Sequence, residues 1–286
     1  MNPTVGPIEA APYGRSRVTR AQVLEDVLDV LDVQSPVTAL SGAPVPLRNL
    51  PSAHGGILGA QLLGQQVALA ERLYPGKRVQ SLQTLFVRSG TWEGTLEAHV
   101  EQLQRGRTFA SVSLAFRQGP ELICRAQVLL TADEPGPAPA TTPGRPRPDP
   151  PHPPDTTPVA VALLPWETRL AAGGTWQDHE LWMRVRSVPA DATLWRALVA
   201  YACEPTTLPL FIADRGAADR PHTSLMVAQT VTFFEDIDVR DWYVVRTEVP
   251  YAGAERVHGR GQVLDGGGTP RALFTTVGLF RLAAGG

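Results

Sequence analysis

Hydrophobic and polar positions follow the same order twice along this chain. In each half, one stretch with apolar residues at helical spacing precedes several runs in which apolar and polar residues alternate. The first helical stretch covers about residues 55–73, and the second is ATLWRALVAYAC, residues 192–203. This order predicts, in each half, one helix followed by an antiparallel meander of strands.

The alternating runs of the two halves also correspond to each other in detail. FVRSGTWEGTLEAHVE (86–101) in the first half parallels FFEDIDVRDWYVVRTE (233–248) in the second. QGPELICRAQVLLT (118–131) parallels GGGTPRALFTTVGLF (266–280), and each of these begins with a hairpin turn. We therefore predict a two-fold internal repeat of about 120 residues per unit, a period too long for a solenoid.

A proline-rich segment separates the two halves. Eleven of the residues 134–158 are proline, which lacks an N–H and fixes φ, so that we expect no helix or central strand there. The chain then divides into an N-terminal tail (1–20), a first unit (21–133), this linker and a second unit (159–286). Because a sheet that curls around an apolar helix buries both, we predict an α+β fold with two antiparallel sheets, each wrapped around a helix. Pairing of the two sheets edge to edge would remove two exposed edges.

Composition and charge exclude several functional classes. Hydrophobic residues make up 43% of the 286 residues and the formal net charge is −2, so there is no broad basic field for nucleic acid and no polybasic patch for a membrane. Two cysteines, Cys124 and Cys203, indicate a reducing compartment without a disulfide framework. The N-terminus lacks an apolar signal region, and no apolar run approaches the roughly 18 residues that span a bilayer. We expect a cytoplasmic protein.

Several segments together resemble the type II acyl-CoA thioesterases, which have a double hotdog fold. The resemblance rests on HGGILGAQLL (54–63), RGRTFASVSLAFRQGPELICRAQVLLTADEPG (105–136), LWMRVRSVPADATLWRALVAYACEPTTLPL (181–210) and RVHGRGQVLDGGGTPRALFTTVGLFR (256–281). It implies hydrolysis of a fatty acyl thioester of CoA, or of acyl carrier protein, to the free acid and the thiol. The sequence contains no metal-ligand cluster, so we expect neither a metal nor a cofactor. The resemblance also implies that chains pair into a homo-oligomer.

The resemblance places an Asp, a Thr and a Gln in the second half, where they position and activate a water. The Asp position is Glu204 in this sequence, and the Gln position is Thr276. The Thr position falls on or near Met226, and a short register slip brings Gln229 or Thr230 there instead. We take Glu204, Thr276 and Thr230 as candidate catalytic residues, and Met226 and Gln229 as candidates that line the substrate site.

Glu204 lies at the end of an apolar helix, directly before Pro205. Burial at such a place would raise the pKa of the carboxyl group and make it a better base near neutral pH. Glu is one methylene longer than Asp, which moves the carboxylate by roughly 1 Å, so the surrounding site must differ from the family's. The alternative is a helix-end carboxylate at the surface or in an ion pair.

The stretch around His54, Gly55 and Gly56 raises a second candidate region. Free N–H groups at a helix start attract negative charge, and in hotdog enzymes such glycines face a thioester carbonyl. We therefore take these three residues, together with Gln61 on the same helix, as candidates for substrate binding. The alternative is a tight turn that feeds a buried helix, and a second site in the first half stays open.

Three functions stay open from the sequence. The first is an acyl thioesterase with Glu204 as the base. The second is a hotdog protein that binds acyl thioesters without hydrolysis, and the third is a dehydratase or hydratase with His54 and Glu204 as the proton-transfer pair. Five arginines are candidates for contacts with CoA phosphates: Arg88, Arg105, Arg107, Arg256 and Arg260.

Overall fold

The computed structural model describes residues 23–34, 37–52, 55–133, 156–161, 163–172, 178–208, 212 and 222–282. Its helices are α1 (Leu24–Leu31), the 3-10 helix η1 (Val37–Ser41), α2 (Gly59–Leu73) and α3 (Ala192–Cys203). The strands of the first half are β1 (Val45–Leu47), β2 (Lys77–Phe86), β3 (Leu96–Arg105), β4 (Phe109–Gln118) and β5 (Glu121–Ala132). Those of the second half are β6 (Thr156–Pro158), β7 (Glu167–Ala171), β8 (Asp178–Arg184), β9 (His222–Phe233), β10 (Tyr243–Gly253), β11 (Arg256–Asp265) and β12 (Pro270–Leu282).

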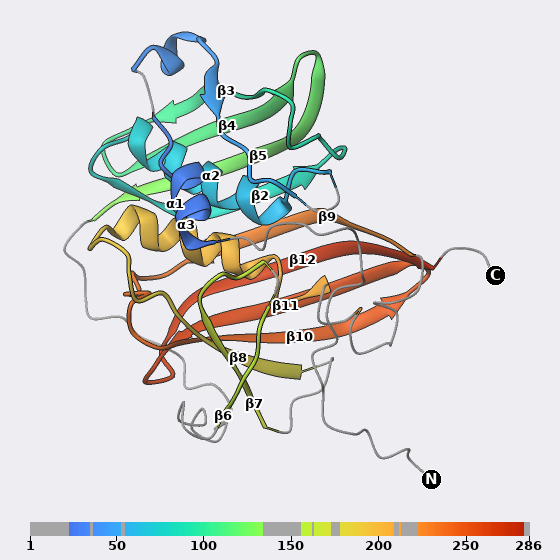
Figure 1. Ribbon diagram of the computed structural model, residues 1–286. Coiled ribbons are helices and arrows are strands. Elements are labelled where there is room, and N and C mark those ends of the chain that lie inside the picture. Colours follow the sequence, from blue (N-terminus) through green and yellow to red (C-terminus); the bar gives the residue numbers. More distant parts are fainter. Residues whose placement is uncertain are drawn as a thin grey trace.

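The strands form one antiparallel sheet that runs through both halves (Figure 1). Its twelve strands follow the order β1-β3-β4-β5-β2-β9-β12-β11-β10-β8-β7-β6. The halves meet where β2 pairs with β9, with Ser81–Leu85 opposite Ala228–Thr232. Because the sheet curls over α2 and α3, the predicted double hotdog fold and the edge-to-edge pairing are confirmed.

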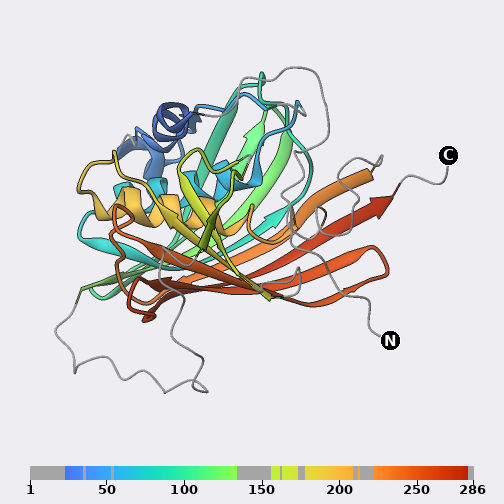
Figure 2. The same ribbon diagram turned by 60° about the horizontal axis from the view of Figure 1, so that its bottom comes forward.

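Helices α2 and α3 lie side by side on one face of this sheet, as the two ribbon views agree (Figures 1 and 2). α3 spans the residues that the hydrophobic pattern predicts, since Asp191 caps its start by accepting hydrogen bonds from Thr193 N at 2.9 Å and Leu194 N at 3.3 Å. α2 is buried over nearly its whole length, because α3 and the sheet cover it on different sides. The two helices are thus the centre of the hydrophobic core.

α2 begins four residues later than the predicted start near residue 55. The preceding backbone is extended and pairs with a loop that is distant in sequence. Ile57 N donates to Gly90 O at 3.1 Å, and Trp92 N donates to Gly55 O at 3.1 Å. The apolar spacing of the sequence cannot show this competing interaction.

The closest approach of α2 to its neighbours is at Gly64. A Cβ atom at this position would lie 2.5 Å from Leu31 Cδ2 and 3.1 Å from Ala197 O. Ala197 belongs to α3 and Leu31 to α1. Glycine at position 64 therefore lets three helices pack closely together.

The predicted tail (1–20) and nearly all of the proline-rich linker (134–158) lie outside the described residues. The described end of the linker is β6, a three-residue strand at the edge of the sheet, where a proline is tolerated. The boundaries of the two units stay a prediction. No helix in the described part of the chain is long and apolar enough to cross a membrane.

Candidate active site

Glu204 lies where the end of α3 meets the start of α2. It is the C-cap residue of α3. A Cβ atom on Gly59, the first residue of α2, would lie 3.5 Å from Glu204 Cγ and 3.6 Å from Glu204 Oε1. The same Cβ position is 3.6 Å from the ring of Phe86 on β2. Since residue 59 has no side chain, the carboxylate lies directly against the first turn of α2.

The first turn of α2 offers hydrogen-bond donors at this place. No side chain caps the helix at Leu58, and the bond from Leu62 N to Leu58 O, 3.3 Å long, is the first of the helical series. The backbone N–H groups of residues 59–61 therefore have no acceptor within the helix. They also carry the partial positive charge of the helix N-terminus.

The carboxyl group of Glu204 is buried although the residue as a whole is partly exposed. Its Oε2 atom is inaccessible to solvent and has no hydrogen-bond partner among the described residues. Burial raises the pKa of this carboxyl group to about 7. The pKa of Tyr201, one turn earlier on α3, is raised by burial and, to a smaller extent, by the charge of Glu204. Glu204 thus changes its protonation state near neutral pH.

A row of polar positions crosses the inner face of the sheet. Cross-strand pairing places Thr84 of β2 beside Gln229 of β9, Gln229 beside Thr276 of β12, and Thr276 beside Gly259 of β11. Thr276 Oγ1 donates to Gln229 Oε1 at 2.9 Å, and Thr84 Oγ1 donates to Gln66 Oε1 on α2 at 2.7 Å. Gln229 Nε2 is buried and has no partner among the described residues.

The turn that follows α3 covers this row. A Cβ atom on Gly259 would lie 2.3 Å from Thr207 Cγ2, so the glycine makes room for the threonine. Thr207 N also contacts Glu204 O at 3.5 Å. Thr207 Oγ1 is buried and, within the described chain, lacks a partner. We group Glu204, Thr207, Gln229 and Thr276 as the candidate active site.

The row of positions related to this one by the internal repeat is entirely apolar. The two halves are related about the centre of the β2–β9 ladder, where Gln83 pairs with Thr230. On the other side of this centre, the residues that correspond to the polar row are, in the same order, Val231, Leu82, Val128 and Val112. All four are buried members of the core. Because apolar residues fill the related positions in the same fold, packing of the sheet does not by itself explain the polar row.

Glu71 is the counterpart of Glu204 in the first half. It follows the first residue of α2 by twelve positions, as Glu204 follows that of α3. Its carboxylate accepts hydrogen bonds from Arg196 Nε at 2.6 Å, Arg196 Nη2 at 2.7 Å, Thr193 Oγ1 at 2.6 Å and Val79 N at 2.8 Å. Glu71 is thus a paired structural carboxylate, and Glu204 lacks such partners within the described residues.

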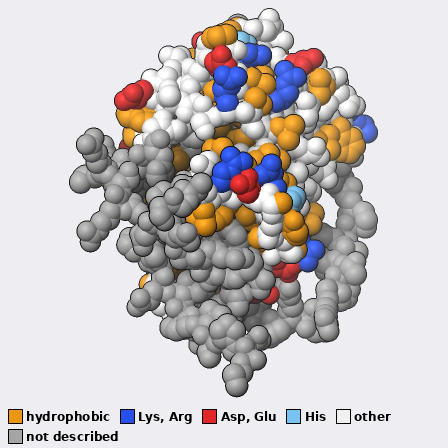
Figure 3. All heavy atoms as spheres, turned by 90° about the vertical axis from the view of Figure 1, so that its right-hand side faces the viewer, with side chains coloured by type: hydrophobic (Ala, Val, Ile, Leu, Met, Phe, Trp, Pro, Cys, Tyr) orange, Lys and Arg blue, Asp and Glu red, His pale blue; other side chains and the backbone are white. Residues whose placement is uncertain are grey.

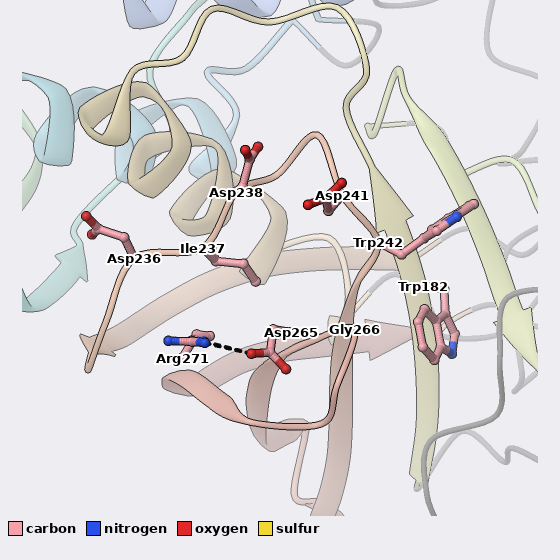
Figure 4. A pocket seen from close by; sticks show the side chains of 9 residues that line it. All are labelled: Trp182, Asp236, Ile237, Asp238, Asp241, Trp242, Asp265, Gly266 and Arg271. Carbon is pink, nitrogen blue, oxygen red and sulfur yellow. Dashed lines mark hydrogen bonds and ion pairs between the residues drawn. The ribbon is translucent and has the colours of Figure 1, made fainter. Parts of the chain in front are cut away.

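A pocket of about 410 Å³ lies near the other end of α3, between β8, the β9–β10 connection and the β11–β12 turn (Figure 4). Its lining includes Trp182 and Trp242 together with four aspartates. Three of these aspartates bind arginines: Asp236 with Arg196, Asp238 with Arg240 and Asp265 with Arg271. Hydrogen bonds from Arg240 lower the pKa of Asp238. Acids that are paired and ionised in this way are poor candidates for a base near neutral pH.

Comparison with protein families identifies the first half of the chain. Residues 46–131 match the model of the acyl-CoA thioesterase N-terminal domain. This segment belongs to that family. The resemblance to the type II acyl-CoA thioesterases is therefore confirmed. A search of curated proteins found no significant match to the sequence.

Solved thioesterase structures share the fold over nearly the whole chain. The tesB protein of Mycobacterium avium subsp. paratuberculosis is 22% identical with a TM-score of 0.72, and the match covers 90% of this chain and 99% of that one. Acyl-CoA thioesterase II TesB2 of Mycobacterium marinum is 21% identical with a TM-score of 0.74, covering 91% and 100%. The dehydratase domain from the CurJ module of the curacin polyketide synthase is less similar, with 14% identity, a TM-score of 0.52 and coverage of 79% and 83%.

The prediction that Thr230 is a catalytic residue needs a correction. Its Oγ1 lies 2.6 Å from Thr275 Oγ1 on the outer face of the sheet, opposite to the face that carries Gln229. A one-residue step along a strand reverses the side-chain direction, so Thr230 points away from Glu204. Of the two residues that the register slip left open, Gln229 lies on the side of Glu204.

The prediction that Gln61 binds substrate is also corrected. Gln61 is fully buried, and its Oε1 accepts from Leu50 N at 2.7 Å. Its Nε2 contacts Arg48 O at 3.1 Å and Asn49 Oδ1 at 3.0 Å. The amide therefore holds the segment before α2 in place, and both of its N–H donors are used within the protein.

The glycines before α2 have mainly structural contacts. Gly55 has a positive φ of 72° and its N–H donates to Ser52 O at 3.1 Å, which uses the donor that the sequence assigned to substrate. Gly56 forms a β-bridge with Thr91, and its role in binding stays a prediction. His54 lies outside the described residues.

Met226 shares the inner face of the sheet with Gln229. A register shift between Val277 and Gly278 of β12 brings Met226 opposite Gly278. A Cβ atom on Gly278 would lie 3.2 Å from Leu208, in the chain that follows α3, so this part of the sheet faces the candidate site. Met226 as a lining residue stays a prediction.

Sequence reasoning did not single out Thr207 or Glu71. For Glu71, the equal spacing from the two helix starts is a signal that the repeat could have given. Thr207 depends on its packing against Gly259, which is distant in the sequence, and no local pattern marks it.

Proposed function

We propose that this chain hydrolyses an acyl thioester of CoA or acyl carrier protein, with Glu204 as the general base. The observation that carries the proposal is the carboxyl group of Glu204, whose buried Oε2 has no partner among the described residues and which lies against the start of α2. A base is most effective when its pKa is close to the working pH, and burial raises the pKa of Glu204 to about 7. The thioesterase domain in the first half supports the same activity.

In the proposed reaction, Glu204 accepts a proton from a water as the water oxygen attacks the thioester carbonyl carbon. The C–S bond then breaks, and the protonated Glu204 returns the proton to the departing sulfur. The products are the free acid and the thiol, and Glu204 is again ionised. One base therefore serves both steps without a metal or a cofactor.

Two sets of groups are the proposed donors for the developing oxyanion. Thr276 Oγ1 occupies the amide oxygen of Gln229, so the amide nitrogen is the free end of that side chain. The uncapped N–H groups at the start of α2 are a second set of donors. Preorganised donors of this kind stabilise negative charge that develops in the transition state.

Compared with the pattern of the type II acyl-CoA thioesterases, the hydroxyl and the amide of this site lie on each other's strands. The resemblance expects the hydroxyl on the strand of Met226 and the amide at position 276. Here the amide is Gln229 on β9 and the hydroxyl is Thr276 on β12. Because the two residues are hydrogen-bonded partners, the exchange keeps the same pair of chemical groups on the same face of the sheet.

The contacts of CoA phosphates with arginines stay a proposal. Of the five candidates, Arg88 pairs with Glu121, and Arg260 pairs with Glu248 at 2.6 Å. On the face that lies to the right in Figure 1, Figure 3 shows basic and acidic side chains beside one another, with hydrophobic ones between them. The described part of this face therefore shows no broad patch of positive charge.

The test is thiol release from acyl-CoA substrates of short, medium, long and aromatic acyl groups. We expect the wild type to release thiol from at least one of them and Glu204→Gln to lower kcat/KM by about 100-fold or more. Glu101→Gln, which changes an exposed carboxylate on β3, is the matched control and should keep full activity. Full activity of Glu204→Gln would contradict this mechanism.

The two alternative functions give different products in the same experiment. A binding protein would retain the acyl-CoA unchanged, and a dehydratase or hydratase would convert it between hydroxyacyl and enoyl thioesters without releasing thiol. The similarity to a polyketide dehydratase domain concerns the fold. Analysis of the acyl product therefore separates all three functions.

A further inference from the structure

α3 carries a single charged residue, Arg196. Its guanidinium group binds both oxygens of Glu71 on α2, with Nε–Oε1 and Nη2–Oε2 distances of 2.6 and 2.7 Å. Another nitrogen contacts Asp236. The side chains of Arg196 and Glu71 are only 7% and 3% exposed. This ion pair therefore joins the start of α3 to the end of α2 inside the protein.

The contact has a defined geometry. A guanidinium that binds both carboxylate oxygens fixes direction as well as distance. Thr193 Oγ1 adds a hydrogen bond to Glu71 Oε2 at 2.6 Å, and Val79 N adds one to Oε1 at 2.8 Å. Glu71 is thus tied to α3 and to β2 at once, which fixes the position of α3 along its own axis.

At the other end of α3 the described residues form no such ion pair; there Thr206 Oγ1 donates to Cys203 O at 3.0 Å, and His179 Nε2 lies 2.9 Å from Thr206 O. The carboxylate of Glu204 packs against Gly59, and its Oε2 has no hydrogen-bond partner in the described part of the chain. Arg196 precedes Glu204 by eight residues, which is about 12 Å along a helix. Between them, Ala197 O lies in close contact with Gly64. The place of Glu204 therefore depends on where the rest of α3 is held.

We propose that Arg196 is a positioning residue, which holds Glu204 against the start of α2 by fixing α3 to Glu71. The catalytic consequence rests on the proposed function, whereas the position of Glu204 does not. Arg196 acts through geometry, because its ion pair is with Glu71 and not with Glu204. Among the described residues, the titratable side chains around this end of α3 include Tyr201 and Cys203 on the helix and His179 on β8, which contacts Thr206 O.

The test separates the charge of Arg196 from its geometry. Arg196→Lys keeps the positive charge and loses the bidentate contact with the Glu71 carboxylate. Arg246→Lys is the matched control, since Arg246 also forms a buried ion pair, with Glu180 at 2.6 Å, but lies on β10. Thr193→Val is a milder variant that removes one hydrogen bond to Glu71 and serves if Arg196→Lys does not fold.

The first readout is the titration of Glu204. For each variant, urea unfolding across pH is compared with the same variant carrying Glu204→Gln, and the difference gives the pKa of Glu204. We expect Arg196→Lys to raise the acid dissociation constant of Glu204 about tenfold, because a displaced carboxylate is better hydrated. Thr193→Val should shift it in the same direction by less, and Arg246→Lys should leave it unchanged.

The second readout is the kinetics of thiol release. We expect Arg196→Lys to lower kcat about tenfold or more, with KM within about twofold of the wild type, because a displaced base affects the chemical step. A lower melting temperature with an unchanged titration of Glu204 would show that Arg196 is structural only. An equal shift in Arg246→Lys would also overturn the proposal. If the wild type releases no thiol, the proposed function fails, and the titration alone decides whether Arg196 positions Glu204.

Discussion

Replacing Glu204 by Gln should remove a loss of folding stability that the wild type undergoes as the pH rises. Burial raises the pKa of Glu204 from 4.5 to about 7, so the folded state holds this proton more tightly than the unfolded state. The resulting stabilisation is fully present below the ordinary pKa and is lost as the pH rises through about 7. Gln is neutral at every pH, and the variant does not lose stability in this way.

The expected size follows from the shift of the pKa. A shift from 4.5 to about 7 corresponds to about 3 kcal/mol of free energy of unfolding over the whole titration. Between about pH 5.5 and about pH 8.5, the titration of Glu204 changes the free energy of unfolding by about 2 kcal/mol. This change is large compared with the error of a difference between two variants.

The assay is urea unfolding of the wild type, Glu204→Gln and the control Glu101→Gln at several pH values. We expect the free energy of unfolding of the wild type, relative to Glu204→Gln, to fall by about 2 kcal/mol from about pH 5.5 to about pH 8.5. The control should run parallel to the wild type. If the wild type and Glu204→Gln also run parallel, the carboxyl group of Glu204 is hydrated and the reasoning from its burial is refuted.

Three further substitutions test the packing and the site. Gly64→Ala introduces a Cβ atom 2.5 Å from a side-chain carbon of α1, and urea unfolding should show a loss of about 1–3 kcal/mol. Arg196→Met leaves Glu71 buried without its partner, and the same measurement should show a loss of about 3–5 kcal/mol. Thr276→Val frees the amide of Gln229, and thiol release should fall about fivefold, since one hydrogen bond contributes about 1 kcal/mol. Thr275→Val, on the outer face, should leave the activity unchanged.

The repeated fold could be predicted because local patterns and long-range packing agree in it. The apolar spacing of residues 192–203 defines α3, and Asp191 caps its start. The start of α2 was predicted too early, because the backbone of residues 55–57 pairs with a loop near residue 90 and therefore does not join the helix. Interactions between distant segments decide such boundaries, and a local pattern does not contain them.

The candidate site could be predicted only in part. The burial of the Glu204 carboxyl group follows from its place at the end of an apolar helix. The choice between Gln229 and Thr230 depends on which face of β9 each residue occupies. A register shift near Gly278 affects this part of the sheet, and the sequence does not reveal it. The proposed exchange of hydroxyl and amide between β9 and β12 depends on the pairing of these strands, which the sequence does not contain.

The pH dependence of thiol release tests the central claim most directly. With an acyl-CoA that the wild type hydrolyses, we predict that kcat/KM rises with pH to a plateau and is half-maximal near the pKa of Glu204, about 7. This dependence should disappear in Glu204→Gln together with most of the activity. A wild-type kcat/KM that stays constant across this range, or a Glu204→Gln variant with the same profile and rate, would contradict the account.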